Sequence, residues 1–486
     1  MSKSWESMEK NKLALIADFY ELTMAAGYFA SGKQAEIAYF DLFFRTIPDG
    51  GGYAVAAGQS EVIDYLMNLK FNADDIDFLR SKNMFSEAFL TYLKTFKFSG
   101  DVWMVKEGSV VFPNEPLAIV RANIIEAQLI ETYLLLQMNH QSLIATKASR
   151  IVRAAQGRPI MEFGARRAHG VDSALLGAKA AYIGGVYGTS LAKADQLYQI
   201  PALGTMAHSW VQMFNSELEA FIEYAKSYPN NATFLVDTYN VLKSGVPNAI
   251  LAIQTVLWPK GIKTAGIRID SGDLTYLSKE ARKLLDEAGC EAVKIVVSNS
   301  LDEWIITELL IQGARIDSFG VGERLITAKS EPVFGGVYKL VATEKNGKIE
   351  PKIKISENPE KMTNPHFKQV YRIFDRQTNK ALADLVTVFD EVIDETMPLE
   401  IFDPTLIHKR KLLTDFYVEK RLHQVIASGV VKIEPMTLEA ARNHLRKELD
   451  QMWDEVKRFA NPHQYYVDLS DKLWNIRKTM IENSIR

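Results

Sequence analysis

Six short clusters of polar residues in the middle of the chain have the residue types needed for chemistry. They are 166–169 with two arginines and a histidine, 205–209 around His208, 237–240, 270–273, 298–300 and 319–324. Each cluster directly follows a short apolar run. In parallel β/α folds the reacting groups lie where strands end and loops begin. Six such clusters in succession therefore predict a single shared site.

The residue types in these clusters indicate an anionic ligand. Arg166, Arg167 and Arg268 provide planar donor groups that suit a carboxylate or a phosphate. The segments 298–300 and 320–322 each lead into a helical pattern, so their backbone N–H groups can bind phosphate oxygens. Asp270 and Asp273 are acceptors suited to sugar hydroxyls, or to Mg²⁺ through water. The sequence predicts a phosphorylated sugar together with an anionic small molecule.

The elements that must position these clusters are short apolar strands alternating with helical segments. The strands are expected at 159–163, 201–206, 233–237, 265–269, 293–297 and 315–320. The later strands recur at roughly the spacing of a βαβ unit. Between two of them, Leu274, Leu277, Ala281 and Leu285 form one apolar helix face, which Asp273 can cap. This pattern predicts a parallel β/α architecture, closed or nearly closed like a barrel.

The two ends of the chain have a different pattern. A helix is expected over 13–31 with Gly32 as its stop, then a strand over 35–45, antiparallel strands over 100–122 and a long helix over 123–155. After Gly336 the pattern favours hairpins, and 437–486 is expected to be helical and charged.

Composition excludes several classes of protein. The 57 Lys and Arg against 60 Asp and Glu exclude a generally basic nucleic-acid binder. The single cysteine, Cys290, excludes a disulfide framework and a multi-cysteine metal site. The polar N-terminus lacks the apolar core of a signal peptide, and no stretch is long and apolar enough to span a membrane. We therefore expect a cytoplasmic protein with no nucleic-acid or membrane partner.

Five motifs together resemble the nicotinate phosphoribosyltransferase family. They are DFYELTM (18–24), GARRAHG (164–170), GTMAHSWVQMF (204–214), RIDSGDL (268–274) and FGVGERL (319–325). The resemblance implies that nicotinate and 5-phosphoribosyl 1-diphosphate give nicotinate mononucleotide and diphosphate, with ATP hydrolysis coupled to the reaction and Mg²⁺ as cofactor. It also implies a homodimer with shared active sites. The implied fold is α/β: an irregular β/α barrel of the type II phosphoribosyltransferases, plus a smaller α+β domain.

The implied domains are 1–140, the first part of the α+β domain, then the barrel over 141–335 with the active site. Strands over 336–436 complete the α+β domain, and 437–486 is a C-terminal helical segment.

The resemblance also assigns roles to individual residues. His208 becomes the histidine that ATP transiently phosphorylates, with Asp270 as a second catalytic residue. Phe163 and Tyr20, the latter from a second subunit, lie on the two faces of the nicotinate ring, which Thr205 and Arg268 also contact. Ribose and phosphate are assigned to Arg166, Ser298, Asn299, Gly320, Gly322 and Thr327, and Asp273 is a candidate for Mg²⁺ through water.

Several of these residues have a plainer structural interpretation. Asp273 can simply cap a helix, Tyr20 can fill a core, and Arg166 can belong to a structural ion pair. Some relatives have a threonine after Gly-Val-Gly, where this chain has Glu323-Arg324. The 5-phosphate contact then passes to backbone donors, Arg324 or Thr327.

Two other functions stay open from the sequence. A nicotinamide-using relative would have a carboxylate to accept from the amide, whereas this chain has the neutral Gly188-Thr189-Ser190 in the corresponding region. A barrel protein that binds phosphorylated metabolites without turnover is the second alternative, and the set of His208, Arg268 and Asp270 argues against it.

Overall fold

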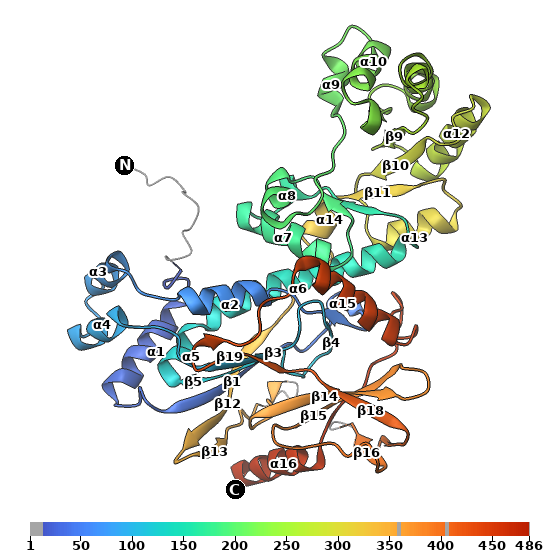
Figure 1. Cartoon of the computed structure of the whole chain (residues 1–486). Helices are drawn as coiled ribbons and strands as arrows, with labels where there is room; N and C mark the ends of the chain where they lie inside the picture. Colours follow the sequence, from blue (N-terminus) through green and yellow to red (C-terminus); the bar gives the residue numbers. More distant parts are fainter. Residues whose placement is uncertain (1–12, 357–360, 404–407, 486) are drawn as a thin grey trace. The chain divides into compact units, whose positions relative to one another are not determined.

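The computed structural model describes residues 13–356, 361–403 and 408–485, which form two compact units. Unit 2 is the continuous segment 144–332, and unit 1 is made from the residues before and after it. Figure 1 colours the chain along its sequence, so the blue and the orange-to-red segments of unit 1 can be followed together. Unit 1 is therefore built from both ends of the chain.

Unit 2 contains a six-stranded sheet in which every pair of neighbours is parallel. Its strands are β6 (Ile160–Glu162), β7 (Gly188–Thr189), β8 (Thr233–Leu235), β9 (Gly266–Ile269), β10 (Lys294–Ser298) and β11 (Ser318–Val321). Their order across the sheet is β7-β6-β11-β10-β9-β8. The first strand of unit 2, β6, thus pairs with its last strand, β11, and the sheet is open only between β7 and β8. The fold class is mixed α/β, as expected, but hydrogen bonds do not close these strands into a barrel.

The helices of unit 2 connect these strands. They are α7 (Val171–Ile183), α8 (Ala192–Tyr198), α9 (His208–Gln212), α10 (Glu217–Ser227), α11 (Val246–Ala252), α12 (Leu274–Glu287), α13 (Glu303–Ile311) and α14 (Glu323–Ile326). Helix α12 begins as the sequence predicts, because the Asp273 side chain accepts the backbone N–H of Tyr276 at 3.0 Å. Ser278, Ala281 and Leu285 form its buried face. The long helix α6 (Glu131–Ala154) contains the boundary between the two units.

The strand expected over 201–206 is wrong. That segment makes one bridge, Ala202 to Thr189, and β7 takes the position next to β6. Pro201 and Ala202 are exposed, and proline has no N–H to donate to a ladder. The Leu203 N–H donates to the Thr189 carbonyl at 2.8 Å, but the Ala202 N–H donates to the Asp195 carboxylate rather than to a further strand, so the segment does not continue as a strand.

Unit 1 contains a seven-stranded antiparallel sheet made from both ends of the chain, in the order β13-β12-β1-β5-β3-β19-β20. The strands are β1 (Ile37–Phe43), β3 (Asp101–Met104), β5 (Ala118–Asn123), β12 (Val337–Lys345), β13 (Lys348–Pro351), β19 (His423–Ala427) and β20 (Val430–Val431). A second sheet contains β18 (Phe416–Lys420), β14 (Lys368–Asp375), β15 (Ala381–Val388) and β21 (Val467–Leu469). Two small pairs complete the strands: β2 (Ala54–Val55) with β4 (Val110–Val111), and β16 (Leu399–Phe402) with β17 (Arg410–Leu413).

The helices of unit 1 are α1 (Phe19–Ala30), α2 (Gln59–Asn68), α3 (Ala73–Ser81), α4 (Glu87–Lys94), α5 (Ile124–Leu129), α15 (Leu438–Gln451) and α16 (Asp471–Ile485). Helix α1 begins later than predicted, at Phe19, and ends just before Gly32, which has a positive φ of 70°. The expected helical segment 437–486 is interrupted, because β21 lies between α15 and α16 in the chain and pairs in parallel with β15. A short strand between charged helices leaves little periodic signal in the sequence.

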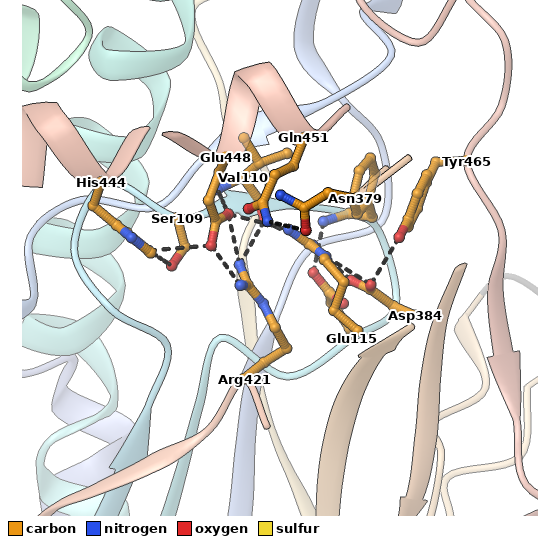
Figure 2. A network of polar contacts seen from close by, with 12 residues as sticks. Ser109, Val110, Glu115, Asn379, Asp384, Arg421, His444, Glu448, Gln451 and Tyr465 are labelled. Atoms are coloured by element: carbon orange, nitrogen blue, oxygen red, sulfur yellow. Dashed lines mark hydrogen bonds and ion pairs between the residues drawn. The ribbon is translucent and has the colours of Figure 1, made fainter. Parts of the chain in front are cut away.

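A buried network of charges joins helix α15 to the strands of unit 1 (Figure 2). Arg372 on β14 donates to both carboxylate oxygens of Asp384 on β15, at 2.8 and 2.7 Å. The guanidinium of Arg372 also contacts Glu448 of α15 at 3.1 Å, and Arg421 contacts Glu448 at 2.8 Å. Arg372 and Asp384 are fully buried, so removing one partner of these ion pairs would leave an uncompensated buried charge.

Within the described ranges, no helix is long and apolar enough to cross a membrane.

Candidate active site

The parallel registers of unit 2 bring the predicted polar clusters to one edge of its sheet. Val297 pairs with Ile269, and Ser298 pairs with Gly320. On the other side of β11, Val321 pairs with Glu162. The residues that follow these positions therefore leave the sheet together, as the sequence predicts for a site at the carboxyl ends of strands.

Arg268 on β9 is the centre of a polar cluster at this edge. Its Nε donates to the Ser298 hydroxyl at 2.9 Å, and its Nη2 donates to Asp270 Oδ1 at 3.0 Å. Its Nη1 contacts the Thr205 hydroxyl at 3.3 Å. Ser298 and Asp270 are also hydrogen-bonded to each other. Four residues assigned to the site from the sequence are thus in direct contact, and they hold the guanidinium in one orientation.

Phe163 lies against this cluster and provides an aromatic surface. The Cζ atom of Arg268 is 5.4 Å from the centre of the Phe163 ring, within the range of a cation–π contact. Gly320 lies directly beside the ring, because a Cβ at that position would be 2.5 Å from the ring atom Cδ2. Glycine is therefore required at 320 for the ring to occupy its place.

Asp237, which follows β8, supports the loop after β9. Its Oδ2 accepts the backbone N–H of Asp270 at 3.0 Å and the Ser271 hydroxyl at 2.7 Å. Its Oδ1 is buried and has no hydrogen-bond partner. Asp237 lies in a predicted polar cluster without an assigned role, although a carboxylate directly after a buried strand is a usable signal in the sequence.

The carboxylates at this edge fit a weakly held Mg²⁺. No group of three or more His, Cys, Asp or Glu side chains that could enclose a metal occurs in the part of the chain that the structure describes. Mg²⁺ commonly binds through one or two carboxylates together with substrate phosphates and water. The unpartnered Oδ1 of Asp237, next to Asp270, provides that kind of donor set.

His208 is the first residue of the short helix α9, and it is partly exposed. Its Nδ1 lies 3.1 Å from the Thr238 hydroxyl, and no described residue hydrogen-bonds to its Nε2. When Nδ1 carries the proton and donates to Thr238, Nε2 has a free lone pair. That geometry suits a histidine that accepts a group at Nε2.

The two segments expected to bind phosphate lie at the carboxyl ends of β10 and β11. Ser298 is buried, whereas Asn299 has a positive φ of 88° and is exposed. Gly322 precedes helix α14. The Thr327 hydroxyl donates to the carbonyl of Glu323 at 2.7 Å, so Thr327 contributes a structural hydrogen bond in this state.

Glu323 and Arg324, which directly follow Gly322, are both paired. Glu323 contacts Lys329 at 2.8 Å, and hydrogen bonding and charge attraction from Lys329 lower the pKa of the Glu323 carboxyl. Arg324 pairs with Asp302, which caps α13 by accepting from Trp304 and Ile305. This ion pair ties together the loops after β10 and β11.

Like His208, Asn299, Gly322 and Thr327, three further predicted residues lie outside the contacts of the central cluster. Arg166 is exposed and makes no ion pair with a described residue, and Asp273 caps α12. Tyr20 belongs to unit 1, where its side chain is 45% exposed on α1 rather than filling a core.

The sequence alone assigns no role to Glu162, because this residue lies inside the apolar run 159–163, which is predicted to be a strand. Its carboxylate is 1% exposed and accepts from the Gly164 N–H and from the Thr189 hydroxyl, the latter at 2.6 Å. Burial raises the pKa of the Glu162 carboxyl, and the two hydrogen bonds oppose that shift. An acidic residue within a buried strand was the available signal.

Comparison with known protein families gives matches over most of the chain. Residues 15–139 match the nicotinate phosphoribosyltransferase N-terminal domain, and residues 159–391 match the nicotinate phosphoribosyltransferase family. Residues 367–477 match the corresponding C-terminal domain.

Individual relatives are similar over nearly their whole length. Nicotinate phosphoribosyltransferase from Bacillus subtilis is 44% identical over 466 residues, which cover 96% of this chain and 94% of that protein. The crystal structure of human nicotinic acid phosphoribosyltransferase has 28% identity and a TM-score of 0.83, covering 96% of this chain and 100% of that one. A nicotinate-nucleotide pyrophosphorylase from Pyrococcus furiosus shares the fold, with a TM-score of 0.71 and 22% identity over 93% of this chain and 99% of that one.

Proposed function

The chain belongs to the nicotinate phosphoribosyltransferase family, and on that basis we propose that it joins nicotinate to 5-phosphoribosyl 1-diphosphate in NAD biosynthesis. The products are nicotinate mononucleotide and diphosphate. The observation that carries the proposal is the fixed guanidinium of Arg268, held by Ser298, Asp270 and Thr205 beside the Phe163 ring. A cation beside an aromatic surface matches the shape and charge of a pyridine carboxylate.

The chemistry that this site must perform needs orientation more than proton transfer. The pyridine nitrogen already has a lone pair, so it attacks the anomeric carbon of the ribose while the bond to diphosphate breaks. The transition state resembles an oxocarbenium ion, and negative charge develops on the leaving diphosphate. Positioning of the two reactants and stabilisation of that charge are the contributions a protein makes to such a step.

Each residue at the sheet edge has a part in this proposal. Arg268 pairs with the nicotinate carboxylate, and Phe163 stacks on the ring. Asp270 holds ribose hydroxyls, and the strand-end segments at Ser298–Asn299 and Gly320–Gly322 bind the 5-phosphate through backbone N–H groups. Arg166, exposed beside β6, supplies a further cation for phosphate.

Mg²⁺ would be held by Asp270 and Asp237, with Asp273 reached through water. When bound, it neutralises charge on the diphosphate. The support for this part of the proposal is the buried, unpartnered Oδ1 of Asp237.

ATP coupling through His208 is the second part of the proposal. Neutral Nε2 attacks the γ-phosphorus of ATP, the bond to the bridging oxygen breaks, and ADP leaves. Water later hydrolyses the phosphohistidine to histidine and phosphate. The contact of Nδ1 with Thr238 supports this assignment, because it leaves Nε2 available.

The proposal extends to architecture. The strand order β7-β6-β11-β10-β9-β8 is the chain order of a six-stranded barrel opened at one seam, which supports an irregular β/α barrel. We propose a homodimer in which the partly exposed Tyr20 ring completes the site of a second subunit.

One assay tests the function against its alternatives. The purified protein is incubated with phosphoribosyl diphosphate and Mg²⁺ plus nicotinate, nicotinamide or quinolinate, each with and without ATP, and the mononucleotide and ADP are quantified. Nicotinate-dependent product whose yield rises with ATP is expected. Preference for nicotinamide would overturn the substrate assignment. Binding of phosphoribosyl diphosphate without turnover of any of the three pyridine substrates would favour a protein that binds phosphorylated metabolites without catalysis.

A further inference from the structure

Glu162 is a buried carboxylate that the proposed chemistry does not use. It is the last residue of β6, next to Phe163, and its two oxygens accept hydrogen bonds from Gly164 and Thr189. No Lys, Arg or His of the described segments forms an ion pair with it. A buried carboxylate without a cation is costly, so these two hydrogen bonds must hold the charge.

The two donors to Glu162 belong to different turns at the sheet edge. Gly164 follows Phe163 and packs tightly against Gly322 of the proposed 5-phosphate segment, since a Cβ at position 164 would be 2.7 Å from the carbonyl oxygen of Gly322. Thr189 ends β7, and its hydroxyl also accepts the N–H of Leu191 at 3.1 Å. The backbone carbonyl of Glu162 accepts from Ser190 at 2.8 Å. Glu162 thus contacts both turns.

We propose that Glu162 is a positioning residue that holds the Phe163–Gly164 segment to the Thr189–Leu191 turn, and thereby fixes the position of the Phe163 ring in the proposed nicotinate site. This inference rests on the proposed function, because Phe163 is the stacking residue there. A carboxylate suits the role because both of its oxygens accept, one for each turn. The Thr189–Glu162 hydrogen bond connects the Thr189–Leu191 turn to the residue that directly precedes Phe163.

Two pairs of variants separate geometry from charge and from stability. Glu162→Gln can keep both contacts, since its amide oxygen accepts from Gly164 and its NH₂ donates to Thr189, whose oxygen has a lone pair left. Glu162→Leu removes both contacts at similar volume. Thr189→Val removes only the Thr189 hydroxyl, which donates to Glu162. Ser278→Ala is the matched control, because Ser278 is a fully buried hydroxyl of unit 2 that also donates and accepts, on α12.

Steady-state kinetics and thermal unfolding are measured for all four variants. Thr189→Val is expected to raise the nicotinate KM about tenfold or more, since a small displacement of a positioned group has large kinetic effects. The KM for phosphoribosyl diphosphate should stay within about twofold. Glu162→Gln should stay close to the wild-type nicotinate KM, whereas Glu162→Leu should raise it at least as much as Thr189→Val. Ser278→Ala should lower the Tm by a similar amount to Thr189→Val without changing either KM.

A wrong positioning role for Glu162 and a wrong proposed function give different results. If the wild-type protein forms no mononucleotide from nicotinate, the function itself fails before any variant is compared. With an active wild type, an unchanged nicotinate KM in Thr189→Val overturns the positioning role. Equal increases in the KM of both substrates, or a Glu162→Gln variant as impaired as Glu162→Leu, also overturn it. Should Glu162→Leu not fold, Thr189→Val and Glu162→Gln still decide the question.

Discussion

The Ser298 hydroxyl and the Asp270 carboxylate are hydrogen-bonded to each other, although they are 28 residues apart in the chain. Ser298 ends β10, and Asp270 follows β9, which is its parallel neighbour. Both side chains also contact Arg268, at 2.9 and 3.0 Å. The residue proposed for nicotinate and the residues proposed for ribose and phosphate are therefore mechanically connected.

Arg268→Ala should raise the nicotinate KM far more than the ATP KM. A lost hydrogen bond to a charged group costs about 1.5–3 kcal/mol, which is roughly 10- to 150-fold in binding. Substrate-dependent rates measured with each substrate varied in turn give both constants. Arg282→Ala is the control, because Arg282 lies on α12 and pairs with Asp286. Equal changes in both constants would refute a carboxylate role.

His208→Asn should fold normally but lose the coupling of ATP hydrolysis to product formation. The variant cannot accept a phosphoryl group at Nε2, so the acid-labile ³²P label from [γ-³²P]ATP should disappear. His169→Asn, an exposed histidine without an assigned role, should keep the label. A label that persists in His208→Asn would exclude this histidine as the acceptor.

Gly320→Ala should displace the Phe163 ring and weaken nicotinate binding. The added Cβ would be 2.5 Å from one ring atom and 3.3 Å from Ser298 Cβ, so the ring must move. A displacement of this size is expected to lower kcat/KM for nicotinate by roughly tenfold to a hundredfold. Gly27→Ala on α1 has open space around its Cβ and should leave kcat/KM unchanged. Wild-type kinetics in Gly320→Ala would show that Phe163 does not define the ring slot.

Glu448→Gln should strongly destabilise the protein. Burial disfavours the charge on Glu448, but Arg421 and Arg372 outweigh it and hold the pKa of that carboxyl well below its usual value. Stability from Glu448 is therefore present above its unfolded pKa of about 4.5 and is lost as the pH falls towards the lower folded value. Breaking these pairs should cost about 3–5 kcal/mol of unfolding free energy. Urea denaturation at pH 7 tests this, and the exposed Arg446→Gln on the same helix should stay within about 0.5 kcal/mol of wild type.

Glu21→Gln should have the opposite pH dependence. Burial raises the pKa of Glu21 to about 7, although Thr132 donates to this carboxyl through its N–H and its hydroxyl. The folded protein therefore binds a proton more tightly than the unfolded chain between pH 4.5 and pH 7. Over that window wild-type stability falls as the pH rises, while a neutral Gln does not contribute to the fall. The unfolding free energy of Glu21→Gln relative to wild type should thus improve from pH 5 to pH 8, and an unchanged difference would contradict the raised pKa.

Features that depend on a local pattern can be predicted from the amino-acid sequence alone. Apolar runs such as 293–297 predicted parallel strands, because strands buried on both faces need continuous hydrophobicity. The polar clusters after those runs predicted the site, and Asp273 before an apolar helical face predicted the cap of α12. The motifs identified the family. Each of these signals lies within about one βαβ unit of the chain.

Tertiary structure decided what depends on partners far apart in the chain. It placed β7 rather than 201–206 beside β6, and it paired β21, which lies in a region expected to be helical, with β15. Strand pairing depends on distant partners that a local stretch of sequence does not reveal. It gave Asp237 and Glu162 their contacts with other turns. Hydrogen-bond partners across parallel strands are fixed only when the sheet forms, so the sequence predicts a candidate site at the strand ends, and the fold determines which of its side chains contact one another.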